Sequence, residues 1–160
     1  MTLISRQLAD SADTDRLGRA LARARPDSAV VHLEGDLGAG KSTLARAMLR
    51  ALGVEGAIRS PTYTLVERYP LRTGGEAWHM DLYRIGDPGE LEFLGLDADE
   101  VNLWLVEWPE RGAGGLPAPD LQVRLAVDGS GRRVQLVPAT DIGRDWLARL
   151  AAESAVAADS

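Results

Sequence analysis

The stretch Gly35-Asp-Leu-Gly-Ala-Gly-Lys-Ser42 matches the pattern G-x-x-x-x-G-K-[ST] of a phosphate-binding loop, or P-loop. Its lysine, Lys41, is the only lysine among the 18 lysine and arginine residues of the chain. An ammonium group is a compact point charge, whereas a guanidinium group is a broad planar fork that fits less easily inside a loop wrapped around phosphates. We therefore interpret Lys41 as a lysine kept for its geometry in a chain that otherwise uses arginine.

The segments on both sides of the loop have the character that a P-loop requires. Residues 29–33 form a short apolar run, typical of a buried parallel strand. Residues 43–52 are almost all good helix formers, and Leu44, Met48 and Leu52 recur every four residues as an apolar stripe. The pattern predicts strand, loop and helix in that order, and the alternative is an ordinary glycine-rich turn with a surface lysine.

The motif predicts how a nucleoside triphosphate and Mg²⁺ are bound. Lys41 is expected to reach the β- and γ-phosphates, and the Ser42 hydroxyl is expected to ligate Mg²⁺. At the N-terminus of a helix the dipole favours negative charge, so backbone N–H groups there converge on phosphate. The residues expected to provide those groups are Gly38, Ala39, Gly40, Lys41, Ser42 and Thr43.

Length and composition bound the class of protein. A chain of 160 residues with 45% apolar and 26% charged residues is typical of one globular domain, placed at residues 1–152 with a flexible tail at 153–160. No run has the length of a membrane span, no signal-peptide core is present, and the cytoplasm is the default compartment. There is no cysteine. The net charge of −6 argues against a broad nucleic-acid footprint, so we expect no DNA and contact with RNA only through a protein partner, with a small local basic patch as the alternative.

The expected fold is α/β: a P-loop NTPase-like three-layer sandwich whose mixed sheet has a parallel centre and antiparallel hairpin additions. A buried strand is predicted over residues 102–106. Two hairpins are predicted, one from residues 58–69 and 77–83 and one from residues 121–127 and 134–136. Helices are predicted over residues 11–25, 87–93 and 141–152, in addition to the helix after the loop.

Hydrolysis needs acids beside the loop, at the carboxyl ends of strands, to hold Mg²⁺ and position water. Glu107 directly follows the apolar residues 103–106, and Asp81 lies in an otherwise apolar strand. We predict that both are catalytic and that both ligate Mg²⁺ together with Ser42. The alternatives are a strand-end glutamate that meets solvent and an aspartate on the exposed face of a hairpin. His79 is interpreted as a structural hydrogen-bonding residue.

Other side chains are expected near the phosphates. Thr62 lies in a hydroxyl-rich segment that can sense the γ-phosphate, or that is a plain turn. Trp108 is expected to shield the phosphates or meet a partner, with packing beneath a loop as the alternative. Arg84 offers a transition-state cation or a salt bridge. Arg132 or Arg133 can stack on a base, and Arg133 is taken as the candidate.

These motifs, in this order, resemble the TsaE family of bacterial tRNA threonylcarbamoyladenosine-biosynthesis ATPases over about residues 5 to 147. The P-loop alone does not single out this family, but the other blocks and their spacing do. Ser42 stands where the family often has threonine, which keeps the hydroxyl. The matching blocks are Gly35-Asp-Leu-Gly-Ala-Gly-Lys-Ser-Thr43, Ser60-Pro-Thr-Tyr-Thr-Leu-Val66, His79-Met-Asp-Leu-Tyr-Arg84, Gly89-Glu-Leu-Glu-Phe-Leu-Gly-Leu96 and Glu107-Trp-Pro-Glu110.

The resemblance implies a small Mg²⁺-dependent ATPase, slow alone, that acts on the TsaB–TsaD complex and not on the tRNA base itself. ATP hydrolysis in such proteins is expected to license or reset that complex between turnovers. The resemblance assigns Lys41 and Ser42 to phosphate and Mg²⁺, Asp81 and Glu107 to metal and water, Thr62 to a switch hydroxyl, and Trp108 to an active-site tryptophan.

Three other functions compete with this one. A small-molecule kinase would need a lid with several cations, and no arginine cluster in the sequence has that form. A GTPase switch generally selects guanine with an Asn-Lys pair, and the only lysine is already assigned to the phosphates. A nucleotide-gated binding module differs from the TsaE-like ATPase mainly in that its function does not require ATP hydrolysis.

Overall fold

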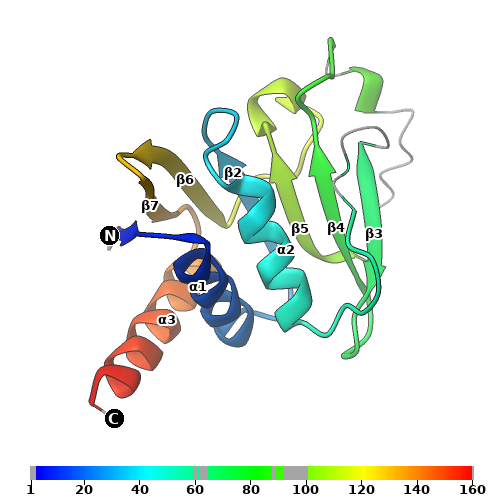
Figure 1. The fold of residues 1–160 in the computed structure, drawn as a ribbon. Helices are drawn as coiled ribbons and strands as arrows, with labels where there is room; N and C mark the ends of the chain where they lie inside the picture. The colour runs from blue at the N-terminus through cyan, green and yellow to red at the C-terminus, as the bar shows by residue number, and fades with distance from the viewer. Residues whose placement is uncertain (1–2, 60, 62–64, 88, 92–100, 160) are drawn as a thin grey trace.

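The computed structural model describes residues 3–59, 61, 65–87, 89–91 and 101–159. Seven strands of this part form one sheet in the order β1-β7-β6-β2-β5-β4-β3, drawn in Figure 1. The strands are β1 (Ile4–Leu8), β2 (Ala29–Glu34), β3 (Val66–Pro70), β4 (Glu76–Asp81), β5 (Val101–Glu107), β6 (Leu121–Asp128) and β7 (Gly131–Pro138).

The sheet is parallel in the middle and antiparallel at both edges. The neighbouring strands β6, β2, β5 and β4 run parallel, whereas β3 pairs with β4, β7 with β6 and β1 with β7 in antiparallel register. Both predicted hairpins are therefore confirmed, as β3–β4 and β6–β7, but β3 begins at Val66 and not at residue 58. Carboxyl ends of parallel strands meet at one edge of a sheet, so β2, β5 and β4 end side by side.

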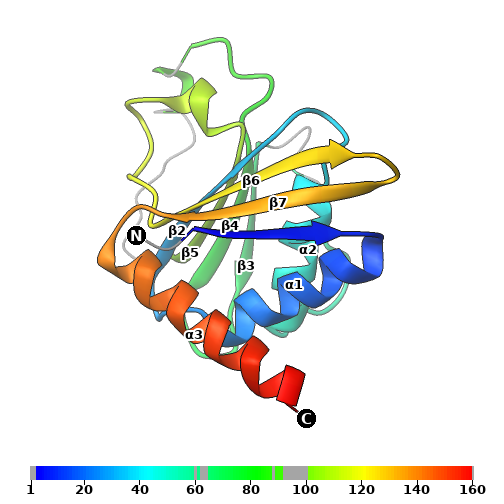
Figure 2. The ribbon, with the colours of Figure 1, turned by 90° about the vertical axis from the view of Figure 1, so that its left-hand side faces the viewer.

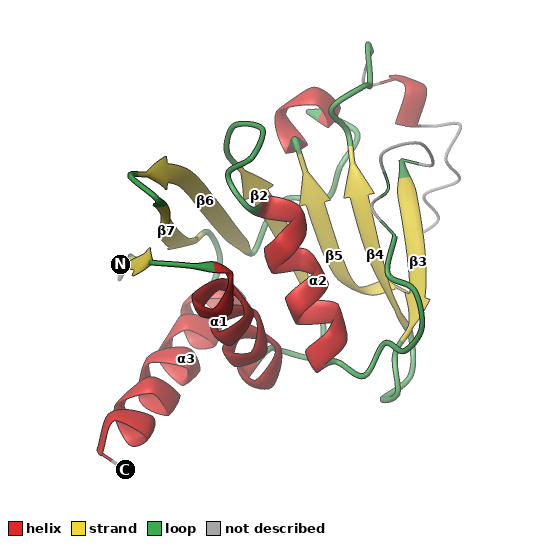
Figure 3. Ribbon diagram, in the orientation of Figure 1, coloured by secondary structure: helices red, strands yellow, loops and turns green. Residues whose placement is uncertain are grey.

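In the described ranges, three α-helices cover one face of the sheet: α1 (Ser11–Ala24), α2 (Lys41–Ala51) and α3 (Asp141–Asp159). In Figure 2, α1 and α3 lie beneath the edge formed by β1, β7 and β6, and Figure 3 shows α2 in front of the central strands. The fully buried Trp146 of α3 ties two of the helices together, because its indole N–H donates to the Leu21 carbonyl of α1 at 3.0 Å.

The opposite face of the sheet carries a second, smaller apolar cluster around Trp78 and Trp104, whose ring centroids are 5.1 Å apart. Within the described residues, the segments that pack on this cluster are connections and a short 3₁₀ helix, η2 (Pro109–Gly112), and not an α-helix. The expected α/β fold with a mixed sheet is thus confirmed, and its third layer is thin in the described part of the chain.

Three elements differ from the sequence-based prediction. Strand β1 was not predicted, because residues 4–8 alternate in burial too briefly to stand out in the sequence. Helix α3 extends to Asp159, beyond residue 152, because its last turns are rich in alanine, the best helix former. The flexibility expected for residues 153–160 stays a prediction. The helix predicted over residues 87–93 lies partly outside the described residues, where residues 89–91 form a 3₁₀ turn.

None of the helices in the described ranges is long and apolar enough to cross a membrane. The cytoplasmic location stays a prediction.

Helices α1 and α2 approach each other closely at Gly18. A Cβ added to Gly18 would lie 2.4 Å from the Cβ of Ala47 and 3.1 Å from the backbone of the same residue. Glycine is therefore required here by lack of space, despite its poor helix propensity. The close crossing holds α2, and with it the start of the helix after the glycine loop, against the rest of the fold.

Substituting Gly18→Ala tests this contact. We expect the free energy of unfolding to fall by about 1–3 kcal/mol because of overpacking, although alanine in a helix is favoured over glycine by about 1 kcal/mol. Urea denaturation measures the change. The double variant Gly18→Ala/Ala47→Gly removes the opposing methyl group and should recover part of the loss. A single variant as stable as the parent would show that the helices do not meet in this way.

Candidate active site

The glycine loop, residues 35–42, connects β2 to α2 at the edge where the parallel strands end. Gly38 and Gly40 have φ angles of +82° and +105°, and a Cβ at either position would meet no atom within 4 Å. Glycine is therefore needed for the left-handed backbone and not for space. Gly40 is the N-cap of α2, so the first N–H groups of the helix point into the loop.

Lys41 is the first residue of α2 and its side chain is nearly buried. Its ammonium donates to the carbonyl oxygen of Asp36 at 3.0 Å and to that of Gly35, and it lies 4.4 Å from the ring centroid of Trp108. Burial lowers the pKa of Lys41, and the nearby carboxylates, first that of Glu107, oppose this shift. The Lys41 ammonium is therefore surrounded by two carbonyl oxygens and an aromatic ring, and phosphate oxygens can take the place of these carbonyl oxygens as its hydrogen-bond partners.

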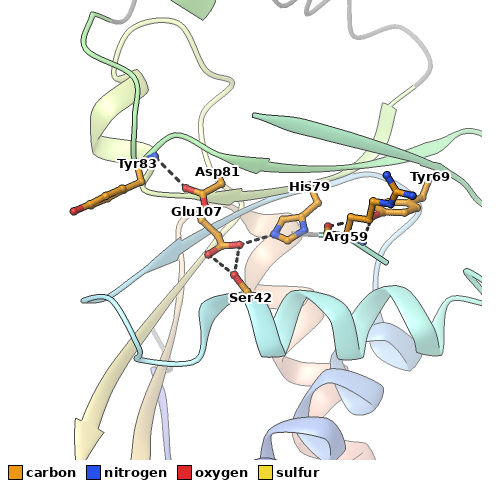
Figure 4. Close-up of polar contacts among 7 residues, drawn as sticks. All are labelled: Ser42, Arg59, Tyr69, His79, Asp81, Tyr83 and Glu107. Carbon is orange, nitrogen blue, oxygen red and sulfur yellow. Dashed lines mark hydrogen bonds and ion pairs between the residues drawn. The ribbon is translucent and has the colours of Figure 1, made fainter. Parts of the chain in front are cut away.

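Glu107, the last residue of β5, is 3% exposed and points toward the start of α2. The Ser42 hydroxyl lies 2.9 Å from each of its two carboxylate oxygens. The Nε2 of His79, a fully buried residue of β4, donates to one of them at 2.6 Å, as Figure 4 shows. This geometry is incompatible with a strand-end glutamate that simply meets solvent, because a buried carboxylate needs such partners.

Asp81 ends β4, and the register of the parallel strands places it directly beside Glu107. It is half-buried, and its carboxylate accepts a hydrogen bond from the backbone N–H of Tyr83 at 3.0 Å (Figure 4). Burial raises the pKa of Asp81, and the charge of Glu107 adds to this shift, while the Tyr83 N–H, His79 and Lys41 oppose it. Two carboxylates thus converge on the glycine loop from adjacent strands.

Trp108 adopts a left-handed backbone conformation, with φ +57° and ψ +51°. This conformation costs an L-residue about 1–2 kcal/mol, and it lets the chain turn sharply from β5 into η2. The indole ring consequently lies over Lys41 and packs on the ring of Tyr83, with centroids 4.9 Å apart. Backbone strain of this kind concentrates at functional sites. Trp108 therefore lies beside the glycine loop, and its role in shielding the phosphates or meeting a partner stays a prediction.

A cavity of about 560 Å³ opens between the glycine loop and the ends of β4 and β5. It is lined by Leu37, Gly38, Gly40, Lys41, Ser42, Thr43, Asp81, Tyr83, Arg84, Glu107, Trp108 and Arg132. Most of the residues predicted from the sequence are therefore brought together around one space.

The remaining predicted residues do not line the cavity. Ala39 is part of the glycine loop, but its side chain is buried and its N–H donates to the Asp36 carbonyl at 3.1 Å. Arg133 does not line the cavity: its guanidinium lies 3.3 Å from the carboxylate of Asp128, and its neighbour Arg132 instead donates to the Gly38 carbonyl at 3.1 Å. The two alternate between the faces of β7.

Thr62 lies outside the described residues. Three residues before it, the backbone N–H of Arg59 donates to the Tyr69 hydroxyl at 3.2 Å (Figure 4).

The donor set fits Mg²⁺. Ser42, Glu107 and Asp81 offer only oxygen atoms, the ligands that this ion prefers, and Mg²⁺ usually takes few of its ligands from protein and the rest from phosphate and water. Within the described part of the chain, no group of three His, Asp or Glu side chains could hold a metal by itself. The site therefore suits an ion shared with a nucleotide more than a fully protein-bound metal.

The contact of His79 with Glu107 was not predicted. The interpretation of His79 as a hydrogen-bonding residue is supported, but its partner is a candidate catalytic acid. A signal was present, since His79 stands two residues before Asp81 and so shares its strand face. Its Nδ1 is buried and has no hydrogen-bond partner within the described residues.

Comparisons with known proteins show which family the chain resembles. The family model described as threonylcarbamoyl adenosine biosynthesis protein TsaE matches residues 8–134. A Haemophilus influenzae protein named tRNA threonylcarbamoyladenosine biosynthesis protein TsaE is 45% identical over 119 residues, which cover 72% of the chain and 74% of that relative. A Streptomyces coelicolor protein of the same name is 38% identical over 135 residues, covering 81% and 91%.

A solved structure shows the same fold. The crystal structure of YdiB from Bacillus subtilis superposes with a TM-score of 0.79 over 96% of the chain and 97% of YdiB, at 22% identity.

The raised pKa of Asp81 gives a prediction for stability. The folded chain binds a proton at this carboxyl more readily than the unfolded chain, so stability falls as pH rises from the ordinary pKa of aspartate through the raised one. Asp81→Asn removes the charge and should be more stable than the parent at neutral pH, by up to about 1 kcal/mol. Urea unfolding measured at several pH values should show that the stability advantage of Asp81→Asn over the parent shrinks as the pH falls from the raised pKa toward the ordinary pKa of aspartate.

Asp27→Asn, on the exposed surface, is the matched control and should change stability little at any pH. A loss of stability in Asp81→Asn at neutral pH would mean that the Asp81 carboxylate is favourable to the fold, contrary to its burial.

Proposed function

The chain belongs to the TsaE family of threonylcarbamoyl adenosine biosynthesis proteins, and from that premise we propose that it binds and hydrolyses ATP with Mg²⁺ in support of tRNA modification. One observation carries the proposal: the buried carboxylate of Glu107 lies between Ser42 of the glycine loop and His79. An acid in contact with the hydroxyl of a P-loop is placed to act on the bound nucleotide and its ion.

Binding depends on the loop and on Lys41. The loop N–H groups at the start of α2 and the ammonium of Lys41 supply the positive potential for a triphosphate. The ammonium now donates to two carbonyl oxygens of its own loop, so it is already desolvated and oriented before phosphate arrives. Trp108 lies over this cation and excludes water from it.

Hydrolysis depends on the two acids. Glu107 accepts hydrogen bonds from Ser42 and His79, and these fix the direction of its carboxylate without needing solvent. A carboxylate held in this way can orient a water molecule and take up its proton. Asp81, beside it in register, holds a second negative charge at the same edge. Mg²⁺, held by Ser42, Glu107 and Asp81, would neutralise charge that develops on the phosphates.

The partner is proposed to be the TsaB–TsaD complex, with the tRNA base left to those proteins. The chemistry of the cavity supports a site completed by another protein, because exposed apolar side chains, Leu37 and Tyr83, stand among its lining residues. ATP turnover would then reset the complex between rounds of modification. A nucleotide-gated switch that binds the same partners without turnover is the alternative.

Substituting Glu107→Gln tests the catalytic assignment. The amide keeps the size of the side chain but cannot take up a proton, so hydrolysis should fall about 10²- to 10⁴-fold while the affinity for ATP changes little. Calorimetric titration and phosphate release measure the two effects. Glu90→Gln, on an exposed residue, should change neither. A Glu107→Gln enzyme that turns over at the parental rate would remove Glu107 from catalysis.

Substituting Lys41→Arg tests whether the site needs a compact cation. The charge is kept, but the guanidinium cannot fit the narrow space between the loop carbonyls and Trp108 without displacing one of them. Loss of one charge-assisted contact should weaken ATP binding about 10- to 100-fold. Arg72→Lys is the control on an exposed side chain. If Lys41→Arg bound ATP as tightly as the parent, the site would not require a compact cation. A titration of the parent with GTP in place of ATP tests which base the site selects.

A further inference from the structure

The outer surface of α1 and α2 is positively charged in a chain whose net charge is −6. Two adjoining hollows on this surface, of about 680 and 560 Å³, share Arg19 as a lining residue. We call them together the arginine groove. Its charged lining residues are Arg6, Arg16, Arg19, Arg23, Arg46 and Arg50, with Asp13, Asp15 and Glu153. Six cations against three acids leave an excess of positive charge that the overall charge conceals.

Helix geometry gathers these arginines. Arg16, Arg19 and Arg23 are spaced by three and four residues on α1, and Arg46 and Arg50 by four on α2, so each set forms a row along its helix. The close approach of the helices at Gly18 places Arg19 of α1 and the two arginines of α2 around one hollow, while Arg16 and Arg23 line the adjoining one. Figure 1 shows the two helices side by side.

The arginines at the centre of the groove lack counter-charges. Arg16 pairs with Asp13 and Arg23 with Glu153. By contrast, Arg19 and Arg46 form neither an ion pair nor a hydrogen bond with any described residue, and Asp15 is not within ion-pair distance of Arg19. Two guanidinium groups, one from each helix, therefore face solvent across the hollow that they line.

We propose that the arginine groove binds the phosphodiester backbone of tRNA directly. A guanidinium fork matches two phosphate oxygens, and release of counterions from RNA favours binding to such a surface. No aromatic side chain is among the described lining residues, so base stacking does not contribute and the contact is to the backbone. The identity of the RNA rests on the proposed role in tRNA modification.

An acidic protein surface is a less suitable ligand for the arginine groove than an RNA backbone. Protein interfaces are centred on apolar and aromatic side chains, and no large exposed apolar side chain is found among the described residues that line the groove. The groove thus differs from the nucleotide cavity, whose lining includes the exposed Leu37 and Tyr83. The two surfaces are suited to different partners, an RNA backbone and a protein.

The double variant Arg19→Ala/Arg46→Ala tests the proposal against Arg72→Ala/Arg144→Ala, which removes the same charge from exposed residues elsewhere. Binding of an unmodified tRNA transcript to the purified chain is measured by fluorescence anisotropy at several salt concentrations. We expect the first variant to bind about 10- to 50-fold more weakly and the slope of log K against log salt to shrink by about 1.5. The control variant should bind as the parent does.

Absence of tRNA binding by the parent at low salt, or an equal loss in both double variants, would overturn the proposal. Polyglutamate serves as a second probe, and binding of polyglutamate without binding of tRNA would overturn it in favour of an acidic protein. ATP hydrolysis by the same samples separates the two proposals. If turnover persists in a parent that binds no tRNA, the arginine groove is wrongly assigned and the proposed ATPase function stands.

Discussion

The buried contact of Glu107 with Ser42 and His79 is the interaction on which the site depends, because it joins the start of α2, the end of β5 and the middle of β4. It exists only in one strand register. Successive side chains of a strand point to opposite faces, so a slip of one residue between β5 and its neighbours would turn Glu107 away from the glycine loop. The apolar side chains before Glu107 hold that register by filling the core on both faces of the sheet.

Opposite charges share this small, poorly solvated space. Lys41, Glu107 and Asp81 lie at one edge of the sheet, and burial disfavours the charged forms of Lys41 and Asp81. The fold tolerates them because the Lys41 ammonium and the Glu107 carboxylate each have specific partners, including the ring of a strained Trp108. A site that keeps costly groups in fixed positions is organised for a ligand whose own charges complete the balance.

The sequence predicted the parts of the site that depend on local rules. The spacing of the glycine loop placed Lys41 and Ser42, and the meeting of strand ends at one sheet edge placed Asp81 and Glu107. The sequence could not predict contacts between residues far apart in the chain. The hydrogen bond between His79 and Glu107 is an example, because 28 residues separate the two positions. The choice between Arg132 and Arg133 depended on which face of β7 each occupies. The net charge of the chain could not predict the arginine groove, because a net charge contains no information about where the individual charges lie.

We propose that the chain is an ATPase whose turnover serves the TsaB–TsaD complex. The most direct measurement is the rate of ATP hydrolysis by the purified chain as TsaB–TsaD is titrated in, with Lys41→Ala as the control for contaminating activity. We expect slow turnover by the chain alone, a rise with the partner complex, and no turnover in the variant. A rate that is the same in every mixture would contradict the claim that partners control hydrolysis.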